Sequence, residues 1–250
     1  MDLSVEFKDQ VGVVTGAADG IGFAIAKLMA ARGGSLALWD VNLEGAERAA
    51  QRIAQETGAK AKAYKADVTS EPSVVAAREA TLADFGRADL LVNNAGIYPH
   101  ATIREITEEA WNRMFDVNTK GVFYATRAFM DPMIKQAYGR VVTIVTEDAY
   151  MPKPTIPHYA ASKAATLSLI KTFALELAPH GVICTGVSPG PVATERAKGQ
   201  SWLAPRIPKI PVLRAAEPED IAEVVLFLGS KRNRFVVGET VIANGGYIMM

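Results

Sequence analysis

The stretch VGVVTGAADGIGFAIAKLMAARG, residues 11–33, changes its hydrophobic pattern at residue 16. The valine-rich residues 11–15 favour a buried β-strand, and the pattern from residue 20 onward predicts a helix over 20–32. Gly16, Gly20 and Gly22 have a G-x-x-x-G-x-G spacing. Glycines there let the backbone turn sharply and approach a pyrophosphate at a helix N-terminus, where free N–H groups favour an anion. The stretch therefore predicts a strand, a glycine turn and a helix that bind dinucleotide phosphates.

The rest of the chain repeats this alternation of strand and helix. Strands are predicted over 11–15, 35–40, 61–67, 89–94, 140–146, 181–188 and 239–244, and helices over 20–32, 43–57, 71–85, 106–136, 157–178 and 217–229. The strands are almost continuously apolar, as expected when both faces of a sheet are covered. The sequence thus predicts an α/β fold with a doubly wound, parallel, seven-stranded sheet and helices on both faces.

Composition narrows the class of protein. The chain has 250 residues, of which 49% are apolar, and Lys+Arg and Asp+Glu are equal at 27 each. This balance argues against a nucleic-acid or anionic-membrane partner. The start MDLSVEFKDQ lacks the apolar core of a secretory signal, and no apolar run reaches the length of a membrane span. We therefore expect a cytoplasmic protein, with its single cysteine, Cys184, in a buried strand.

Asp40 stands at the end of the second predicted strand, about 20 residues after the glycine turn. A carboxylate there can accept hydrogen bonds from an adenosine ribose and repels a 2′-phosphate. Asp19, inside the turn, adds to that repulsion. Together they predict NAD rather than NADP. The alternative is that Asp40 only caps the following helix, a role that Asn42 could fill instead.

Tyr159 and Lys163 stand at the start of PHYAASKAATLSLIKTFALELA, residues 157–178. Their spacing of four places a phenol and an ammonium on one helix face. The ammonium, the helix N-terminus and an oxidised nicotinamide together can lower the phenol pKa from ~10 toward ~7, which suits a proton acceptor. The alternative is a core tyrosine with a lysine that extends to solvent.

Four ordered motifs, TGAADGIG, NNAG (93–96), YAASK (159–163) and PGPVAT (189–194), resemble those of the short-chain dehydrogenase/reductase family over essentially the whole chain. The resemblance implies a single Rossmann-type domain over 1–250, a nicotinamide cofactor, and a homotetramer or homodimer. It also implies an acid/base role for Tyr159 with Lys163 as its partner, and a role for Asn118 in holding a proton-relay water. The cofactor residues it implies, with those argued above, are Gly16, Asp19, Gly20, Ile21, Gly22, Asp40, Asp67, Val68, Asn94, Ala95, Gly96, Tyr159, Lys163, Pro189, Gly190, Val192 and Thr194.

Two positions depart from the family pattern. The usual catalytic serine stands thirteen residues before the tyrosine, where this chain has Thr146. Threonine keeps a hydroxyl that can donate to a substrate oxygen, so we expect Thr146 to replace the serine. Near the C-terminus, Asn244 stands where an acidic residue is commoner.

The substrate region is predicted less directly. The proline-rich segment 189–220 joins a strand to a helix, and its part over about 189–216 is expected to form a substrate lid. Tyr98, Thr146, Tyr150, Met151, Tyr159 and Trp202 are the expected substrate residues, and they favour an apolar or aromatic substrate. Glu147 and Asp148 are expected to be solvated loop carboxylates. His100, His158 and His180 are expected to face solvent or cap a helix, with no metal-ligand spacing.

These features predict an NAD-dependent oxidoreductase that interconverts a small hydrophobic secondary alcohol, aryl alcohols included, and its ketone. One alternative is a 3-oxoacyl thioester reductase of fatty-acid synthesis, which usually prefers NADPH. Another is a regulatory NAD-binding protein without turnover, against which the presence of Asn118, Tyr159 and Lys163 argues.

Overall fold

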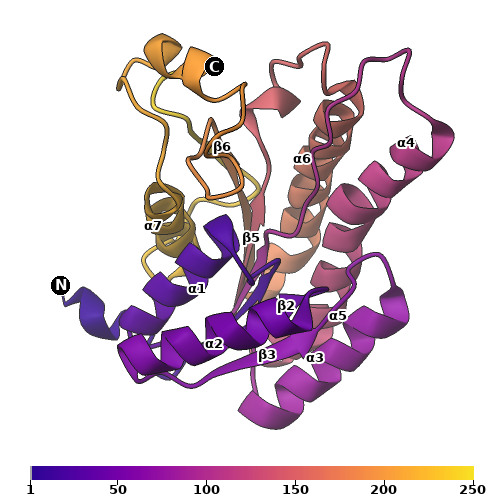
Figure 1. The fold of residues 1–250 in the computed structure, drawn as a ribbon. Helices are drawn as coiled ribbons and strands as arrows, with labels where there is room; N and C mark the ends of the chain where they lie inside the picture. The colour runs from indigo at the N-terminus through magenta and orange to yellow at the C-terminus, as the bar shows by residue number, and fades with distance from the viewer. Residues whose placement is uncertain (1) are drawn as a thin grey trace.

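Seven parallel strands form one sheet in the order β3-β2-β1-β4-β5-β6-β7 (Figure 1). The computed structural model describes residues 2–250, so residue 1 of the predicted domain lies outside the described part. The strands are β1 Val11–Thr15, β2 Ser35–Asp40, β3 Ala61–Lys65, β4 Leu90–Asn93, β5 Gly139–Ile144, β6 Val182–Pro189 and β7 Thr240–Ala243. All seven predicted strands are present, and the predicted parallel sheet is confirmed.

The helices follow the predicted alternation. They are α1 Gly20–Ala31, α2 Leu43–Thr57, α3 Glu71–Phe85, α4 Glu108–Phe115, α5 Gly121–Lys135, α6 Pro157–Leu177 and α7 Pro218–Gly229. Asn42 caps α2, and Ser70 caps α3, by accepting a hydrogen bond from a backbone N–H of the first turn. Glycines in the left-handed conformation, Gly58 and Gly86, end these two helices. These local signals explain why both helices have the predicted bounds.

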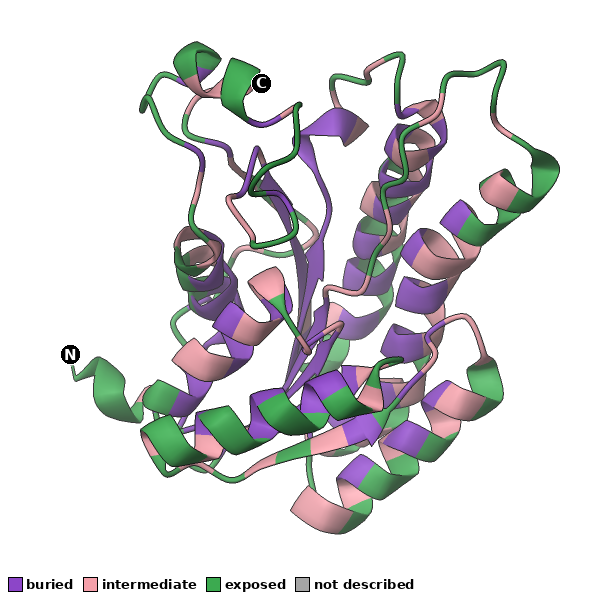
Figure 2. Cartoon of the chain, in the orientation of Figure 1, coloured by how far each residue is buried: buried purple, intermediate pink, exposed green. Residues whose placement is uncertain are grey.

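Two separate apolar cores lie on the two faces of the sheet. Helices α1, α2 and α7 pack on one face through a cluster that includes Ile25, Ile53 and Leu226. Helices α3, α5 and α6 pack on the other through a cluster that includes Phe129 and Phe173. Buried residues accordingly concentrate in the strands and the inner helix faces (Figure 2). The predicted layering is confirmed, and none of the helices within residues 2–250 combines the length and apolarity needed to cross a bilayer.

One predicted helix, 106–136, is wrong as a single element. It consists of α4 and α5 joined by a π-helical turn, Asp116–Lys120. Such turns insert one extra residue into a helix and are frequent at functional sites. Here the turn contains Asn118, whose side chain is fully buried.

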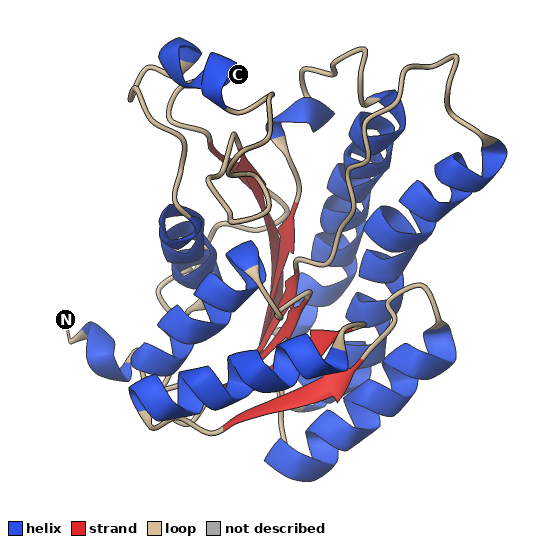
Figure 3. Cartoon of the chain, viewed as in Figure 1, coloured by secondary structure: helices blue, strands red, loops and turns tan. Residues whose placement is uncertain are grey.

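The segment between β6 and α7 has little regular structure (Figure 3). It contains one short 3-10 helix, Ala204–Lys209, and a small apolar cluster formed by Ala197, Leu203 and Ala215. Its Arg196 lies 3.5 Å from Asp19 of the glycine turn. The segment is therefore next to the predicted phosphate site, and its role as a lid stays a prediction.

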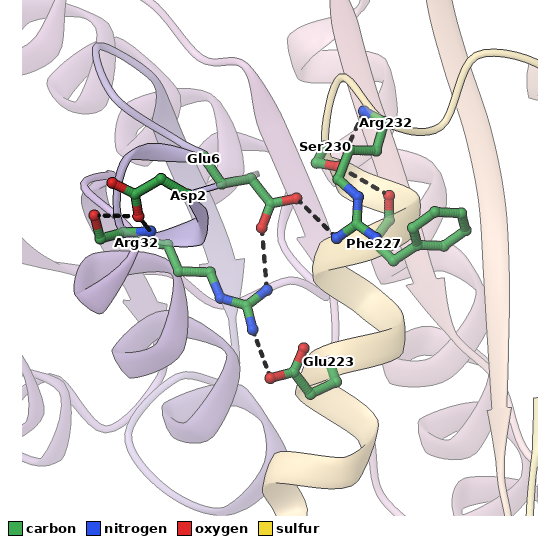
Figure 4. Close-up of polar contacts among 8 residues, drawn as sticks. Asp2, Glu6, Arg32, Glu223, Phe227, Ser230 and Arg232 are labelled. Carbon is green, nitrogen blue, oxygen red and sulfur yellow. Dashed lines mark hydrogen bonds and ion pairs between the residues drawn. The ribbon is translucent and has the colours of Figure 1, made fainter.

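A charge network ties the N-terminal segment to α1 and α7 (Figure 4). The largely buried Arg32 donates to Glu6 (3.1 Å) and to Glu223 (2.5 Å). Arg232 lies 3.5 Å from the other oxygen of Glu6. Since the Glu6 carboxylate is almost fully covered, it depends on these two arginines for its partners.

We expect Arg32→Met to lower the free energy of unfolding by about 3 kcal/mol, because removing one member of a buried ion pair leaves the covered Glu6 carboxylate with only the 3.5 Å contact to Arg232. Urea denaturation followed by circular dichroism measures this loss. The matched control is Arg48→Met, which breaks an exposed pair with Glu44 and should cost less than about 0.5 kcal/mol. Equal losses in the two variants would contradict the expected role of Arg32.

Candidate active site

The glycine turn between β1 and α1 has the conformation that the sequence predicts. Gly16 and Gly20 have φ angles of +63° and +57°, which favour glycine. A Cβ atom on Gly22 would lie 2.3 Å from the Gly16 carbonyl oxygen, so only glycine fits at this position. Asn94, after β4, donates to the carbonyl oxygens of Thr15 (2.9 Å) and Gly16 (3.0 Å) and fixes the turn. The strand order reverses between β1 and β4, which is where parallel α/β sheets bind ligands.

Asp40 lies beside this turn. Its carboxylate accepts hydrogen bonds from the backbone N–H groups of Ala18 (3.0 Å) and Asn42 (2.9 Å). The cap of α2 is Asn42, whose side chain accepts from Gly45 (3.1 Å). The alternative that Asp40 serves as the helix cap is therefore wrong, and the carboxylate belongs to the rim of the cleft.

A cleft of about 1370 Å³ runs from Asp40 to Tyr159. This volume exceeds the roughly 300–1,000 Å³ of common small-molecule pockets, so an extended dinucleotide fits it. The predicted cofactor residues that line it are Gly16, Asp19, Gly20, Ile21, Asp40, Asp67, Val68, Asn94, Ala95, Gly96, Tyr159, Lys163 and Thr194. Gly22, Pro189, Gly190 and Val192 lie outside its lining; Gly22 serves packing, and Val192 pairs with Ala216.

Tyr159 and Lys163 lie at the inner end of the cleft, on the first turns of α6. Lys163 is only 3% exposed and donates to the Ile144 carbonyl oxygen (2.7 Å), so the alternative of a lysine extending to solvent is wrong. Burial lowers the pKa of Lys163 to about 8. The ring of Tyr98 meets that of Tyr159 edge-on at 6.2 Å.

The surroundings of the Tyr159 phenol raise its pKa. Burial raises the pKa of Tyr159 well above its usual value, and the carboxylates of Asp148 and Glu147 raise it further. A hydrogen bond with Thr146 is the one influence that lowers this pKa. Lys163 is not among the groups that lower this pKa, and the acidification expected from Lys163, the helix N-terminus and an oxidised nicotinamide together stays a prediction.

The Asn118 side chain forms hydrogen bonds to two separate parts of the site. Its side chain accepts from the Ile97 N–H and donates to the Ile97 carbonyl oxygen, both at 2.9 Å. It also donates to Ser162 (3.1 Å), which in turn donates to the Tyr159 carbonyl oxygen (2.8 Å). Asn118 thus connects the cleft wall to the helix that carries Tyr159. Ser162 was not predicted from the sequence, although it directly precedes Lys163 in the YAASK motif.

The expectation that Glu147 and Asp148 are solvated is wrong. Glu147 is 3% exposed and Asp148 is 6% exposed. Lys153, for which the sequence predicts no role, lies 3.4 Å from Glu147 and 2.5 Å from Asp148. An ion pair with a lysine five or six residues later makes the burial of the two carboxylates possible.

The other substrate and histidine predictions have mixed outcomes. Tyr98 and Tyr159 line the cleft, whereas Thr146, which is buried, Tyr150, Met151 and Trp202 do not. Trp202 packs against the apolar cluster of the segment between β6 and α7, with Arg206 over its ring. His158 is buried, contrary to the expectation of a solvent-facing or capping side chain, because the first turn of α6 presents it to the interior.

Asn244 donates to the Glu147 carboxylate (3.4 Å). An acidic residue, which is commoner at this position in the family, could not donate this hydrogen bond when ionised. We expect Asn244→Asp to lower the free energy of unfolding at pH 7 by about 1–3 kcal/mol, because it leaves a carboxylate against Glu147. Burial already raises the pKa of Glu147. The folded state therefore binds protons more readily than the unfolded state, so the loss should shrink as pH falls.

Urea titrations of the Asn244→Asp variant at two pH values test this expectation. The double variant Glu147→Gln/Asn244→Asp should regain most of the lost stability, since it removes the repulsion. If the loss is the same with and without Glu147→Gln, the repulsion is not its cause.

Comparison with known proteins agrees with the resemblance to the short-chain dehydrogenase/reductase family over nearly the whole chain. A family model described as Enoyl-(Acyl carrier protein) reductase matches residues 16–248. The chain is 34% identical over 248 residues to the 3-oxoacyl-[acyl-carrier-protein] reductase FabG of Escherichia coli, covering 98% of this chain and 100% of the relative. It is 36% identical over 244 residues to the cyclopentanol dehydrogenase of a Comamonas species, covering 96% and 97%.

Structural similarity is equally extensive. The 3-ketoacyl-(acyl-carrier-protein) reductase from Brucella melitensis, solved in complex with NADH, superposes with a TM-score of 0.90 at 30% identity, covering 97% of this chain and 99% of the other. These matches span the glycine turn, the cleft and the helix that carries Tyr159 and Lys163. The chain therefore belongs to the short-chain dehydrogenase/reductase family.

Proposed function

We propose that this protein is an NAD-dependent oxidoreductase that interconverts a small hydrophobic secondary alcohol and its ketone. The observation that carries the proposal is one cleft with a carboxylate, Asp40, at one end and a partly buried Tyr159 beside a buried Lys163 at the other. An alcohol seated at that inner end meets a phenol for proton transfer. The apolar ring of Tyr98 and the cyclopentanol dehydrogenase relative support a small hydrophobic alcohol.

The proposed cofactor is NAD, because the Asp40 carboxylate can accept hydrogen bonds from ribose hydroxyls and repels a 2′-phosphate. The NADH complex of the Brucella relative supports the same choice. When bound, the dinucleotide supplies a hydride acceptor or donor, and its oxidised ring adds positive charge near the phenol. The glycine turn would hold its pyrophosphate, and Lys163 its nicotinamide ribose.

The protein's own side chains transfer the proton, hold the substrate oxygen and position the helix of Tyr159. Tyr159 takes the hydroxyl proton during oxidation and returns it during reduction. Thr146 donates a hydrogen bond to the substrate oxygen and stabilises charge that develops there. Asn118, through Ser162 and the Ile97 backbone, keeps the helix of Tyr159 in register with the cleft wall. We also propose a cytoplasmic location and a homotetramer or homodimer. Light scattering measures the oligomeric state.

The second candidate function is 3-oxoacyl-[acyl-carrier-protein] reduction, which the FabG relative favours. Asp40 does not separate this candidate from the first, because the Brucella melitensis relative is a reductase of this kind and is solved with NADH. A regulatory NAD-binding protein without turnover is the third candidate, and the assembled Tyr159, Lys163 and Asn118 count against it.

A panel of substrates separates these candidates. NAD reduction at alkaline pH is measured with cyclopentanol, 1-arylethanols and sugar alcohols, and NADH or NADPH oxidation with 3-oxoacyl thioesters. We expect turnover with the hydrophobic secondary alcohols and NAD. Turnover confined to the thioesters would establish the second candidate, and tight NAD binding with no turnover would establish the third.

We expect Asp40→Ala to weaken NAD binding about 10-fold or more, because one carboxylate hydrogen bond to ribose is worth roughly 1.5–3 kcal/mol. The same change should narrow the difference between NAD and NADP by removing charge repulsion. Isothermal titration calorimetry with both dinucleotides measures both effects. Glu44→Ala removes an exposed carboxylate from the first turn of α2 and is the matched control. Unchanged NAD affinity in Asp40→Ala would refute the ribose role.

A further inference from the structure

A buried charge cluster lies directly beside the proposed catalytic hydroxyl. The cluster consists of Glu147, Asp148 and Lys153, with Asn244 and Tyr247 of the C-terminal segment against it. It occupies the 3-10 turn Glu147–Ala149 and the loop after it, which pack on α6. Two buried carboxylates with one lysine carry a net negative charge next to the site where a phenol must ionise.

A chain of contacts leads from Lys153 to the Thr146 hydroxyl. Lys153 contacts one oxygen of Asp148 at 2.5 Å. The other Asp148 oxygen is 3.4 Å from the Thr146 hydroxyl, at the long end of the hydrogen-bond range. The Thr146 hydroxyl also acts on the Tyr159 phenol, whose pKa it lowers by hydrogen bonding. A threonine has one O–H proton, so donation to Asp148 competes with donation to Tyr159 or to a substrate oxygen.

We propose that Lys153 is a positioning residue for the proton transfer: its ammonium engages Asp148 and offsets the Glu147–Asp148 pair, which keeps the Thr146 hydroxyl available to Tyr159 and the substrate oxygen. This inference rests on the proposed function of Tyr159 and Thr146 and adds a residue outside their motifs. Without Lys153, Asp148 becomes a stronger acceptor for the threonine proton, and its full negative charge acts on the phenol.

The charged and polar groups around this path each raise or lower the pKa of Tyr159 or of Glu147. Asp148, Glu147 and Tyr98 disfavour phenolate at Tyr159, and Thr146 favours it. Lys153 lowers the pKa of Glu147 while burial raises it, and Asn244 donates to the same carboxylate. Lys163, on the next turn of α6, is engaged by the Ile144 carbonyl oxygen. Lys153 is thus the cation in direct contact with both carboxylates among the residues that the structure describes.

The expected result for Lys153→Met is an upward shift of about one pH unit in the ionisation of Tyr159, the low end of what a nearby charge produces. At a fixed pH below that ionisation, alcohol oxidation should slow about 10-fold. Lys153→Arg should restore both values. The matched control is Lys62→Met, which removes a lysine from an ion pair with Asp84 at 2.6 Å on β3, far along the chain from the site.

Two readouts test this shift, and the first does not depend on the substrate. The first is a carbon-13 NMR titration of tyrosine ring carbons in the NAD complex, with Tyr159→Phe assigning the resonance. The second is the pH profile of kcat/KM with cyclopentanol and NAD. The double variant Lys153→Met/Asp148→Asn removes the carboxylate that competes for the Thr146 proton and should return the NMR midpoint toward that of the unsubstituted protein.

The outcomes separate the two proposals. No turnover with any alcohol, together with a shifted NMR midpoint in Lys153→Met, refutes the proposed function and supports the role of Lys153. An NMR midpoint that is the same in Lys153→Met, Lys62→Met and the unsubstituted protein overturns the role of Lys153, whatever the activity. Thermal unfolding of each variant shows that the compared proteins are folded.

Discussion

Tyr159→Phe is expected to lower kcat for alcohol oxidation by about 10²–10⁴-fold, the range that one positioned acid/base group supplies. The substitution removes the phenol oxygen and keeps the ring that meets Tyr98. The fold and the cleft should therefore persist, and NAD should bind with nearly unchanged affinity. Steady-state kinetics and calorimetric NAD titration measure the two quantities on the same preparation.

The pH dependence of the unsubstituted protein belongs to the same prediction. Oxidation needs the phenolate, and burial with Asp148 and Glu147 raises the pKa of Tyr159. The oxidation rate should therefore rise with pH and level off on the alkaline side of the phenol ionisation in the complex. Ketone reduction uses the protonated phenol, so it should be level near neutral pH and fall on the alkaline side.

Tyr124→Phe is the matched control, since it removes a phenol oxygen from α5 and should leave kcat unchanged. A Tyr159→Phe protein that interconverts alcohol and ketone at the parental rate would show that another group transfers the proton. A loss of both activity and NAD binding would instead show that Tyr159 serves mainly to bind the cofactor.

The elements that the sequence predicts best are those with strong local signals. The glycine turn is one, because Gly22 leaves no room for a Cβ atom and the requirement is visible in residue type alone. Helix α2 is another, since Asn42 and Gly58 mark its two ends. Tyr159 and Lys163 are found because a spacing of four fixes their common helix face.

The missed features depend on contacts between distant or irregular parts of the chain. The burial of Glu147 and Asp148 requires Lys153 in a loop and Asn244 near the C-terminus, and no periodic pattern connects them. The π-turn around Asn118 interrupts a helix whose hydrophobic pattern reads as continuous. The pKa direction of Tyr159 follows from its burial and from these two carboxylates, which only the folded arrangement brings together.

The second large effect is expected at Thr146, where Thr146→Val should lower kcat by about 100-fold or more. Valine keeps the branched shape of threonine and removes the hydroxyl, so packing changes little while the substrate oxygen loses a donor. Thr146→Ser keeps the hydroxyl and should retain most of the activity. Comparing kcat for the three proteins in both reaction directions tests the role of the hydroxyl without changing the size of the side chain greatly.

A structural effect of Thr146→Val must be separated from the catalytic one. The Thr146 hydroxyl also accepts from the Asp148 N–H (3.2 Å), so its removal leaves a buried donor without a partner. That loss should lower the free energy of unfolding by about 1–3 kcal/mol, which urea titration measures. The catalytic role holds if kcat falls about 100-fold at temperatures where the variant is fully folded. Full turnover in Thr146→Val would mean that the proton transfer at Tyr159 proceeds without a hydroxyl at this position.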